Sequence, residues 1–177
     1  GKLRALHNLS HYYLIEKNYV KAFTTLHLLA KSNASPHYTS YAHSNLGTLY
    51  LQLEEYSKAE TEFKKGIDIQ PSRPSNYLNL GTVYASQGLY QKAIDTYEKA
   101  ERLHTDYKWG VLASPELYLN KAQSLLKLGL YKEAEKYAMQ FNKLVGPGKG
   151  HYFLGQLYGG VMGKLTDALH EYSLSGD

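Results

Sequence analysis

The chain has 177 residues, enough to bury a core, and its 43% hydrophobic and 20% charged residues are typical of a soluble folded protein. The net charge of +4 is spread along the chain, which argues against nucleic acid as the main partner because such proteins concentrate positive charge on one surface. The lack of cysteine excludes disulfides and sulfur-ligated metals, and no stretch approaches the roughly 18 apolar residues that span a membrane.

The first helix pair is predicted in residues 3–39, where apolar residues recur at helical spacing on both sides of a polar turn. Its first helix carries the segment Asn8–Tyr13. A similar segment, Asn45–Tyr50, follows 37 residues later in a second predicted pair over residues 40–73. We expect Pro71 to end the second helix of that pair.

The third helix pair, residues 74–114, is the clearest copy of the second. Its segment Asn79–Tyr84 follows Asn45–Tyr50 by 34 residues, and the matching alanines, Ala59 and Ala93, shift by the same distance. Two adjacent copies in the same phase make an internal repeat the main feature of the sequence.

The fourth helix pair is predicted over residues 115–147, after an N-cap at Ser114 and a proline at the first helical position, Pro115. The fifth is predicted over 148–177. Glycines within residues 159–163 are expected to form the turn between its two helices.

The period of 34 residues, with Leu-Gly-x-x-Tyr followed by Ala-x-x-x-Phe and then Pro, resembles the tetratricopeptide repeat. This resemblance implies an all-α protein. It would be an α-solenoid of about five antiparallel helix pairs in a right-handed superhelix, forming a single array over residues 1–177. We expect Gly47 and Ala59 to let helices approach closely, and tyrosines such as Tyr19, Tyr50 and Tyr131 to be packing contacts between helices.

Asparagine recurs at one position of the first helix in four of the five predicted pairs, two residues before the small residue. Helix stability does not explain this recurrence, because asparagine is a mediocre helix former. First helices line the inner wall of such a superhelix, and a primary amide matches the N–H and C=O groups of an extended peptide. The alternative is that these amides bond to adjacent helices. The four residues are Asn8, Asn45, Asn79 and Asn120.

This row of asparagines is similar to the asparagine-lined tetratricopeptide arrays of O-GlcNAc transferase and kinesin light chain, which hold extended peptides largely by the backbone. The similarity does not extend to the carboxylate clamp of co-chaperones. That clamp needs lysine, asparagine and arginine, whereas the corresponding concave positions here include Ser44, Ser75 and Leu78. Further residues predicted to contact a peptide on the concave face are His7, His11, Tyr41, Thr48, Thr82, Gln123 and Tyr152.

Catalytic and metal-binding patterns are missing from the sequence. His7 and His11 lie one helical turn apart, but no acidic or sulfur ligand accompanies them, so we expect no metal. The sequence also lacks three patterns typical of catalytic sites: a nucleophile with a nearby base, a phosphate-binding loop, and paired carboxylates. We therefore expect neither a catalytic site nor a cofactor.

We therefore expect a scaffold, not an enzyme, that holds an extended peptide segment of a partner protein in its concave groove. Two alternatives remain open. The array could self-associate or build a complex through its convex face or ends, with Tyr107 and Trp109 as contact residues. It could also be the regulatory region of a longer enzyme, since a chain that opens with Gly1 and enters helical pattern at once looks like a piece of something longer.

Overall fold

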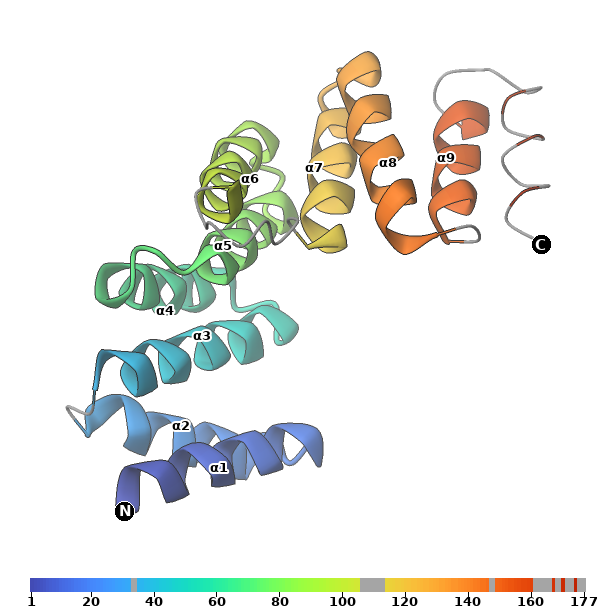
Figure 1. Cartoon of the computed structure of the whole chain (residues 1–177). Coiled ribbons are helices and arrows are strands. Elements are labelled where there is room, and N and C mark those ends of the chain that lie inside the picture. Colours follow the sequence, from blue (N-terminus) through green and yellow to red (C-terminus); the bar gives the residue numbers. More distant parts are fainter. Residues whose placement is uncertain are drawn as a thin grey trace. The chain divides into compact units, whose positions relative to one another are not determined.

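The computed structural model describes residues 1–32, 35–105, 114–146 and 149–160, together with the single residues 167, 170 and 174. These described residues form nine α-helices and no strand, which confirms the all-α fold predicted from the sequence (Figure 1). The chain divides into two compact units, Gly1–Gln87 and Gly88–Asp177, called unit 1 and unit 2 below.

Unit 1 contains five helices, and each packs against the next one along the chain. The first four form two antiparallel pairs, and the fifth begins the third repeat. Short turns join the helices of a pair, so sequence neighbours are also neighbours in space (Figure 1). The helices are α1 (Lys2–Ile15), α2 (Tyr19–Lys31), α3 (Pro36–Gln52), α4 (Tyr56–Ile69) and α5 (Pro74–Ser86).

Unit 2 contains four helices among its described residues, again packed in chain order. They are α6 (Tyr90–Thr105), α7 (Pro115–Lys127), α8 (Tyr131–Val145) and α9 (Lys149–Gly160). The predicted contact residues Tyr107 and Trp109 lie outside the described part of the chain. The helix pairs packed in sequence confirm the predicted solenoid class.

Helix ends follow the signals in the sequence, with two exceptions. α4 ends at Ile69, before Pro71, and α7 begins with Pro115 after the N-cap Ser114, as predicted. The Ser114 side chain, however, makes no capping hydrogen bond. The prediction of a turn at residues 159–163 is wrong at its start, because α9 continues through Gly159.

The turn between the two helices of a repeat has the same backbone conformation in four repeats. Lys17, Glu54, Gly88 and Gly129 occupy one repeat position, and their φ angles are 54°, 58°, 77° and 76°. A left-handed residue lets the chain reverse within a short turn, and glycine adopts it without steric cost. The shared geometry supports the repeat register, although only two of the four residues are glycine.

The core of unit 1 lies between helices of successive pairs and includes Leu26, Leu46 and Leu49. Gly47 contributes by being small, because a Cβ atom there would lie 2.8 Å from the Phe63 ring. Not every tyrosine is a packing residue, however. Tyr19 and Tyr131 begin second helices and are 46% and 42% exposed, so the sequence prediction is wrong for these two side chains.

No helix in the described ranges has the length and apolar character needed to cross a membrane.

Candidate functional site

In unit 1, the helices α1, α3 and α5 present a common surface, called the first-helix face below. The His7 ring of α1 lies over Tyr41 of α3, with ring centroids 4.4 Å apart. Arg73 directly precedes α5, and its Nε donates a hydrogen bond to Ser75 Oγ at 3.3 Å. Arg73 also lies close enough to Tyr41 to influence its pKa. The ring contact joins α1 to α3 on this face, and α3 and α5 are also in contact.

The three asparagines of the predicted row that lie in unit 1 make few hydrogen bonds within the described chain. Asn8 is exposed and its Oδ1 lies 3.3 Å from Nδ1 of the neighbouring His7. Asn45 is half-buried and donates to the Tyr41 carbonyl, one turn earlier in the same helix, at 2.9 Å. Asn79 is half-buried and makes no side-chain hydrogen bond to the described residues. None of the three amides bonds to a neighbouring helix.

Three other predicted peptide contacts of unit 1 also belong to first helices. His11 is exposed on α1. Thr48 and Thr82 are half-buried, and each hydroxyl donates at 3.0 Å to the carbonyl four residues earlier in its own helix. These bonds use the hydroxyl protons, so neither threonine has a proton left to donate to a ligand.

The remaining predicted contacts belong to unit 2. Asn120 and Gln123 lie on α7, the first half-buried and the second exposed. Tyr152 lies on α9 and is 45% exposed. Unit 2 therefore carries a shorter set of candidate residues than unit 1.

Two buried polar groups of unit 1 have no hydrogen-bond partner among the described residues, and the pattern of the sequence does not single them out by this property. The Tyr41 hydroxyl and Arg73 Nη1 are both shielded from solvent without a hydrogen-bond partner in the described chain. Burial raises the pKa of Tyr41, while Ser10 and the Arg73 guanidinium act in the opposite direction. The Ser10 proton is already donated to the His7 carbonyl at 2.8 Å. Arg73 carried no signal in the sequence because it lies in a turn, outside the repeat motif.

Ser44 is not available to a ligand, contrary to its predicted place on the concave face. It is 8% exposed, and its hydroxyl lies within hydrogen-bond distance of two acceptors, the Ser40 carbonyl at 2.8 Å and Oδ1 of Asn76, a fully buried residue of α5. Ser40 in turn donates to the Gly66 carbonyl of α4 at 3.2 Å. These polar groups join α3, α4 and α5 beneath the face.

A buried ion pair joins the two helices of the second repeat. His43 Nδ1 lies 2.7 Å from Glu62 Oε2, and Lys65 lies 2.7 Å from the other oxygen. Burial alone raises the pKa of Glu62, but the hydrogen bonds and charges of His43 and Lys65 outweigh burial and hold this pKa below its usual value. Glu62 is therefore ionised, as a structural contact requires, and the packing position predicted for His43 agrees with this.

Unit 2 contains a buried lysine in a comparable place. Lys121 of α7 is 2% exposed, and its Nζ lies 2.8 Å from the Tyr137 hydroxyl and 3.0 Å from Glu101 Oε2. Burial lowers its pKa, but Tyr137 and Glu101 outweigh burial and raise this pKa above the usual value. The ammonium group is fully partnered, so we assign it a structural role.

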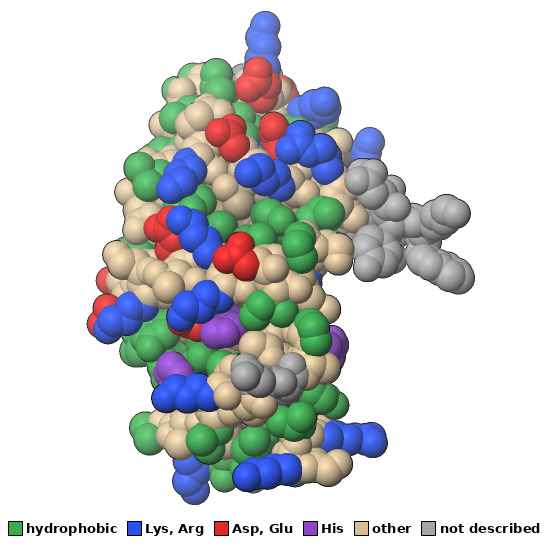
Figure 2. Space-filling view, turned by 90° about the vertical axis from the view of Figure 1, so that its left-hand side faces the viewer, with side chains coloured by type: hydrophobic (Ala, Val, Ile, Leu, Met, Phe, Trp, Pro, Cys, Tyr) green, Lys and Arg blue, Asp and Glu red, His purple; other side chains and the backbone are tan. Residues whose placement is uncertain are grey.

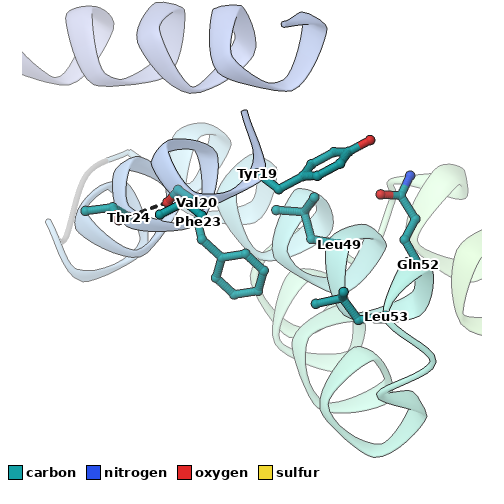
Figure 3. A pocket seen from close by; sticks show the side chains of 7 residues that line it. All are labelled: Tyr19, Val20, Phe23, Thr24, Leu49, Gln52 and Leu53. Atoms are coloured by element: carbon teal, nitrogen blue, oxygen red, sulfur yellow. Dashed lines mark hydrogen bonds between the residues drawn. The ribbon is translucent and has the colours of Figure 1, made fainter. Parts of the chain in front are cut away.

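An apolar pocket of about 710 Å³ opens between α2 and α3 of unit 1. Figure 3 shows the Tyr19 ring beside Leu49 and the Phe23 ring pointing towards the side where Leu53 lies. The pocket is lined by Tyr19, Val20, Phe23, Thr24, Leu49, Gln52 and Leu53. None of the predicted peptide contacts belongs to it.

Neither charged side chains nor possible metal ligands are concentrated at one place in the described residues. Figure 2 shows Asp and Glu side chains interspersed among the Lys and Arg side chains of the face drawn. Within the described residues, no three His, Asp or Glu side chains gather in a way that could hold a metal ion.

Comparisons with known proteins identify the repeat. Residues 44–108 and 78–140 match the tetratricopeptide repeat. Protein O-mannosyl-transferase TMTC1 of Homo sapiens is 36% identical over 93 residues, which are 52% of this chain and 10% of that protein. The chain spans 10% and 18% of the lengths of the curated relatives that it matches.

Solved structures share the fold at low sequence identity. PilW, a type IV pilus biogenesis factor, has a TM-score of 0.82 at 19% identity, covering 98% of this chain and 76% of that one. YrrB, described as a tetratricopeptide protein with an unusual peptide-binding site, has a TM-score of 0.61 at 22% identity, covering 76% of this chain and 66% of that one.

Proposed function

Since the chain belongs to the tetratricopeptide-repeat family, we propose that it is a protein-interaction module whose first-helix face binds an extended peptide segment of a partner. In this role residues 1–177 act by binding, without catalysis and without a cofactor. The partner is a protein or peptide, and nucleic acid is not the intended ligand.

The observation that carries this proposal is the hydrogen bonding of the three row asparagines of unit 1, Asn8, Asn45 and Asn79. Their bonds reach only a neighbouring residue or their own helix, and Asn79 makes none to the described residues. An amide that held the array together would instead bond across to an adjacent helix. These side chains keep donor and acceptor groups for an external ligand.

The spacing of the repeat fits an extended peptide. Adjacent packed helices are about 8–10 Å apart, and an extended chain advances about 3.3 Å per residue. One asparagine would address about every third peptide residue. A peptide held mainly by its backbone needs no particular side chain at those positions, which suits a module that recognises a segment rather than a single residue.

The test is the double variant Asn45→Ala and Asn79→Ala. Each lost hydrogen bond to an uncharged peptide backbone should remove about 0.5–1.5 kcal/mol. We expect affinity for a partner peptide, identified by pull-down and peptide mapping, to fall several-fold to over a hundredfold. Isothermal titration calorimetry measures the change.

The matched control is the double variant Ser57→Ala and Thr61→Ala, which alters two exposed side chains on α4 of the same unit. Its affinity should equal that of the parent protein. The asparagine variant should melt at the same or a slightly higher temperature, because alanine is the better helix former. A variant that melts several degrees lower and binds normally would show that the asparagines are structural.

Self-association is a second candidate function. The exposed apolar pocket between α2 and α3 favours it, because a second copy of the chain could fill this pocket. Val20 and Leu53 at this pocket are 78% and 63% exposed. Sedimentation equilibrium over a concentration series should then detect dimers that the Val20→Lys variant lacks. A constant monomer mass at every concentration excludes this candidate.

A role as the regulatory region of a longer enzyme is a third candidate function. It is favoured by the 36% identity to a protein named as an O-mannosyl-transferase. The array would then present a substrate segment to a catalytic domain outside residues 1–177. The asparagine variant in the full-length protein should raise KM for peptide substrates and leave kcat unchanged. An unchanged KM contradicts it.

A further inference from the structure

One set of three positions on the first helix is buried wherever a second helix precedes it. In α3, this set forms a single apolar cluster with three residues of α2, and the helix pairs α4–α5 and α6–α7 are also packed together. The set is at most 6% exposed in α3, α5 and α7. Its members are Ala42, Leu46 and Leu49 in α3, Asn76, Leu80 and Val83 in α5, and Leu117, Lys121 and Ser124 in α7. These positions are therefore the surface by which a first helix receives the second helix before it.

The same positions are exposed in α1, which lies at the end of unit 1 (Figure 1). They are Ala5, Leu9 and Tyr12, called the outer face of α1 below, and they lie 37 residues before the set of α3. Leu9 and Tyr12 are 40% and 54% exposed, and Ala5 is exposed as well. Ser10 is fully buried, as Gly47 is in α3, so α1 has the register of the other first helices. The end of a solenoid is normally capped by a polar face, so an apolar one indicates a surface that is covered in use.

The second helices share a pattern that identifies the group this face would receive. Each has buried residues at the spacing i, i+4 and i+7, and the first of them is always alanine. The residues are Ala22, Leu26 and Leu29 in α2, Ala59, Phe63 and Gly66 in α4, Ala93, Tyr97 and Ala100 in α6, and Ala134, Ala138 and Phe141 in α8. Most of residues 161–177 lie outside the described structure, but their sequence repeats this pattern as Ala168, Tyr172 and Ser175. The predicted second helix of the fifth repeat thus carries the residues that a first helix accepts.

The charges at the two ends of the chain are complementary in the orientation that the array uses. The start of α2 lies beside the end of α3, because the Phe23 and Tyr50 rings are in contact with centroids 5.0 Å apart. In the same antiparallel orientation, the end of segment 161–177 would lie beside the start of α1. The acidic residues toward the end of the segment are Glu171 and Asp177, and the basic residues at the start of α1 are Lys2 and Arg4. Opposite charges would therefore face each other across this contact.

We propose that the outer face of α1 binds segment 161–177 of a second copy of the chain, so that the array continues from one molecule into the next. Two different surfaces meet in this contact, and each copy keeps one free end, so association does not stop at the dimer. The proposal goes beyond peptide binding, which uses the first-helix face. It also uses a surface other than the apolar pocket between α2 and α3.

Sedimentation equilibrium of the whole chain over a concentration series tests this association. We expect the average mass to rise with concentration beyond that of a dimer. Leu9→Glu places a charge on the outer face of α1 and should leave the chain monomeric. The matched control Leu28→Glu makes the same change at a leucine of α2 that is 53% exposed, and it should associate like the parent protein. A constant monomer mass of the parent protein, or equal effects of the two changes, would overturn the proposal.

A mixing experiment identifies the segment that occupies the face. Tyr172→Glu alters segment 161–177 and leaves the outer face of α1 intact, whereas Leu9→Glu does the reverse. Each variant alone should be monomeric, and an equimolar mixture should form a dimer that does not grow, because one intact surface of each kind remains. Formation of this dimer excludes misfolding as the reason for the monomers, since an unfolded variant would not recombine. A mixture that stays monomeric contradicts the proposed occupant.

Two further sets of variants test the orientation and the choice of surface. Lys2→Glu with Arg4→Glu should weaken association several-fold, and mixing this variant with Glu171→Lys should recover part of the loss. No recovery contradicts the antiparallel orientation on which the proposal depends. Val20→Lys alters the pocket between α2 and α3 and should associate like the parent protein. If Val20→Lys is monomeric and Leu9→Glu associates, the pocket is the interface and the proposal is wrong.

Discussion

The second repeat, in unit 1, and the fourth repeat, in unit 2, form contacts between the same pairs of helix positions. The residue types at these positions, and therefore the kinds of contact, differ. His43 and Glu62 form an ion pair between α3 and α4, and the equivalent residues of α7 and α8 are Tyr118 and Tyr137, whose rings stack with centroids 6.3 Å apart. Leu46 is fully buried in the apolar core of unit 1, and its equivalent in unit 2 is the buried Lys121.

The reason a lysine replaces a leucine lies in the neighbouring helices. Lys121 reaches the Tyr137 hydroxyl and Glu101 of the preceding second helix. At the position of Glu101, α2 of unit 1 has Ala30. At the position of Tyr137, α4 of unit 1 has Glu62, whose carboxylate is already paired with His43 and Lys65. The comparison teaches that the backbone of the repeat determines which residue positions are in contact. The type of contact at each position depends on the residues of the neighbouring helices.

The largest expected effect comes from exchanging the two residues. Leu46→Lys places a charge in an apolar core that offers no free partner, and an uncompensated buried charge costs about 3–5 kcal/mol. Adding Ala30→Glu should recover part of this loss. Lys121→Leu should cost less than this, because the carboxylates that it leaves without a partner, Glu98 and Glu101, are 46% and 26% exposed and remain partly hydrated. Urea denaturation measures all three variants, and equal losses for both exchanges would refute the comparison.

A second difference concerns the small residue of the first helix. Gly47 faces Phe63, whereas the equivalent residues of unit 2 are Ala122 and Ala138. A Cβ atom at residue 47 would lie 2.8 Å from the aromatic ring, so Gly47→Ala should destabilise the protein by about 1–3 kcal/mol through overpacking. The double variant Gly47→Ala and Phe63→Leu should be less destabilised than the sum of its single changes. Thermal unfolding measures the coupling, and strict additivity would contradict the steric explanation.

The two buried contacts should respond to opposite ends of the pH scale. The pKa of Glu62 is lowered in the folded state, so its stabilisation is present above its unfolded value of 4.5 and is lost as the pH falls through the lower folded pKa. The pKa of Lys121 is raised, so its stabilisation is present below 10.5 and is lost as the pH rises through the higher folded pKa. The stability difference between the parent protein and Glu62→Gln should therefore become smaller at acidic pH. The difference between the parent protein and Lys121→Leu should become smaller at alkaline pH. Urea midpoints between pH 3 and 11 test this, and a difference independent of pH contradicts it.

The smallest expected effect concerns the left-handed turn residues. Glu54 pays a steric cost at its φ of 58°, and Gly129 meets the same requirement without one. Glu54→Gly should stabilise unit 1 by up to about 1 kcal/mol, and Gly129→Ala should destabilise unit 2 by about the same amount. Differential scanning calorimetry resolves shifts of this size. Opposite signs would show that side-chain contacts, not the backbone, decide these turns.

Much of the fold was predictable from the sequence because the repeat restates the same information several times. Helix starts at Pro115 and ends before Pro71 follow from the missing N–H and fixed φ of proline, which act locally. The exposed rings of Tyr19 and Tyr131 were not predictable from the pattern, because a shared repeat position does not determine what the neighbouring helix covers.

Parts of the candidate site depended on contacts that no sequence window contains. The recurrence of asparagine was visible in the sequence, since one position returned with the period. The burial of Ser44 against Asn76 joins residues that are 32 positions apart in the chain.

The sequence by itself determined the helices, their order and the asparagine row, because periodicity, prolines and small residues act within one repeat. Only the tertiary structure decided which polar groups are paired. Lys121 finds a hydroxyl and a carboxylate on two other helices, whereas the Tyr41 hydroxyl and Arg73 Nη1 are each buried without a hydrogen-bond partner among the described residues. The physical reason is that a buried polar group is stabilised by atoms packed around it in space, and these come from elements that the chain brings together only on folding.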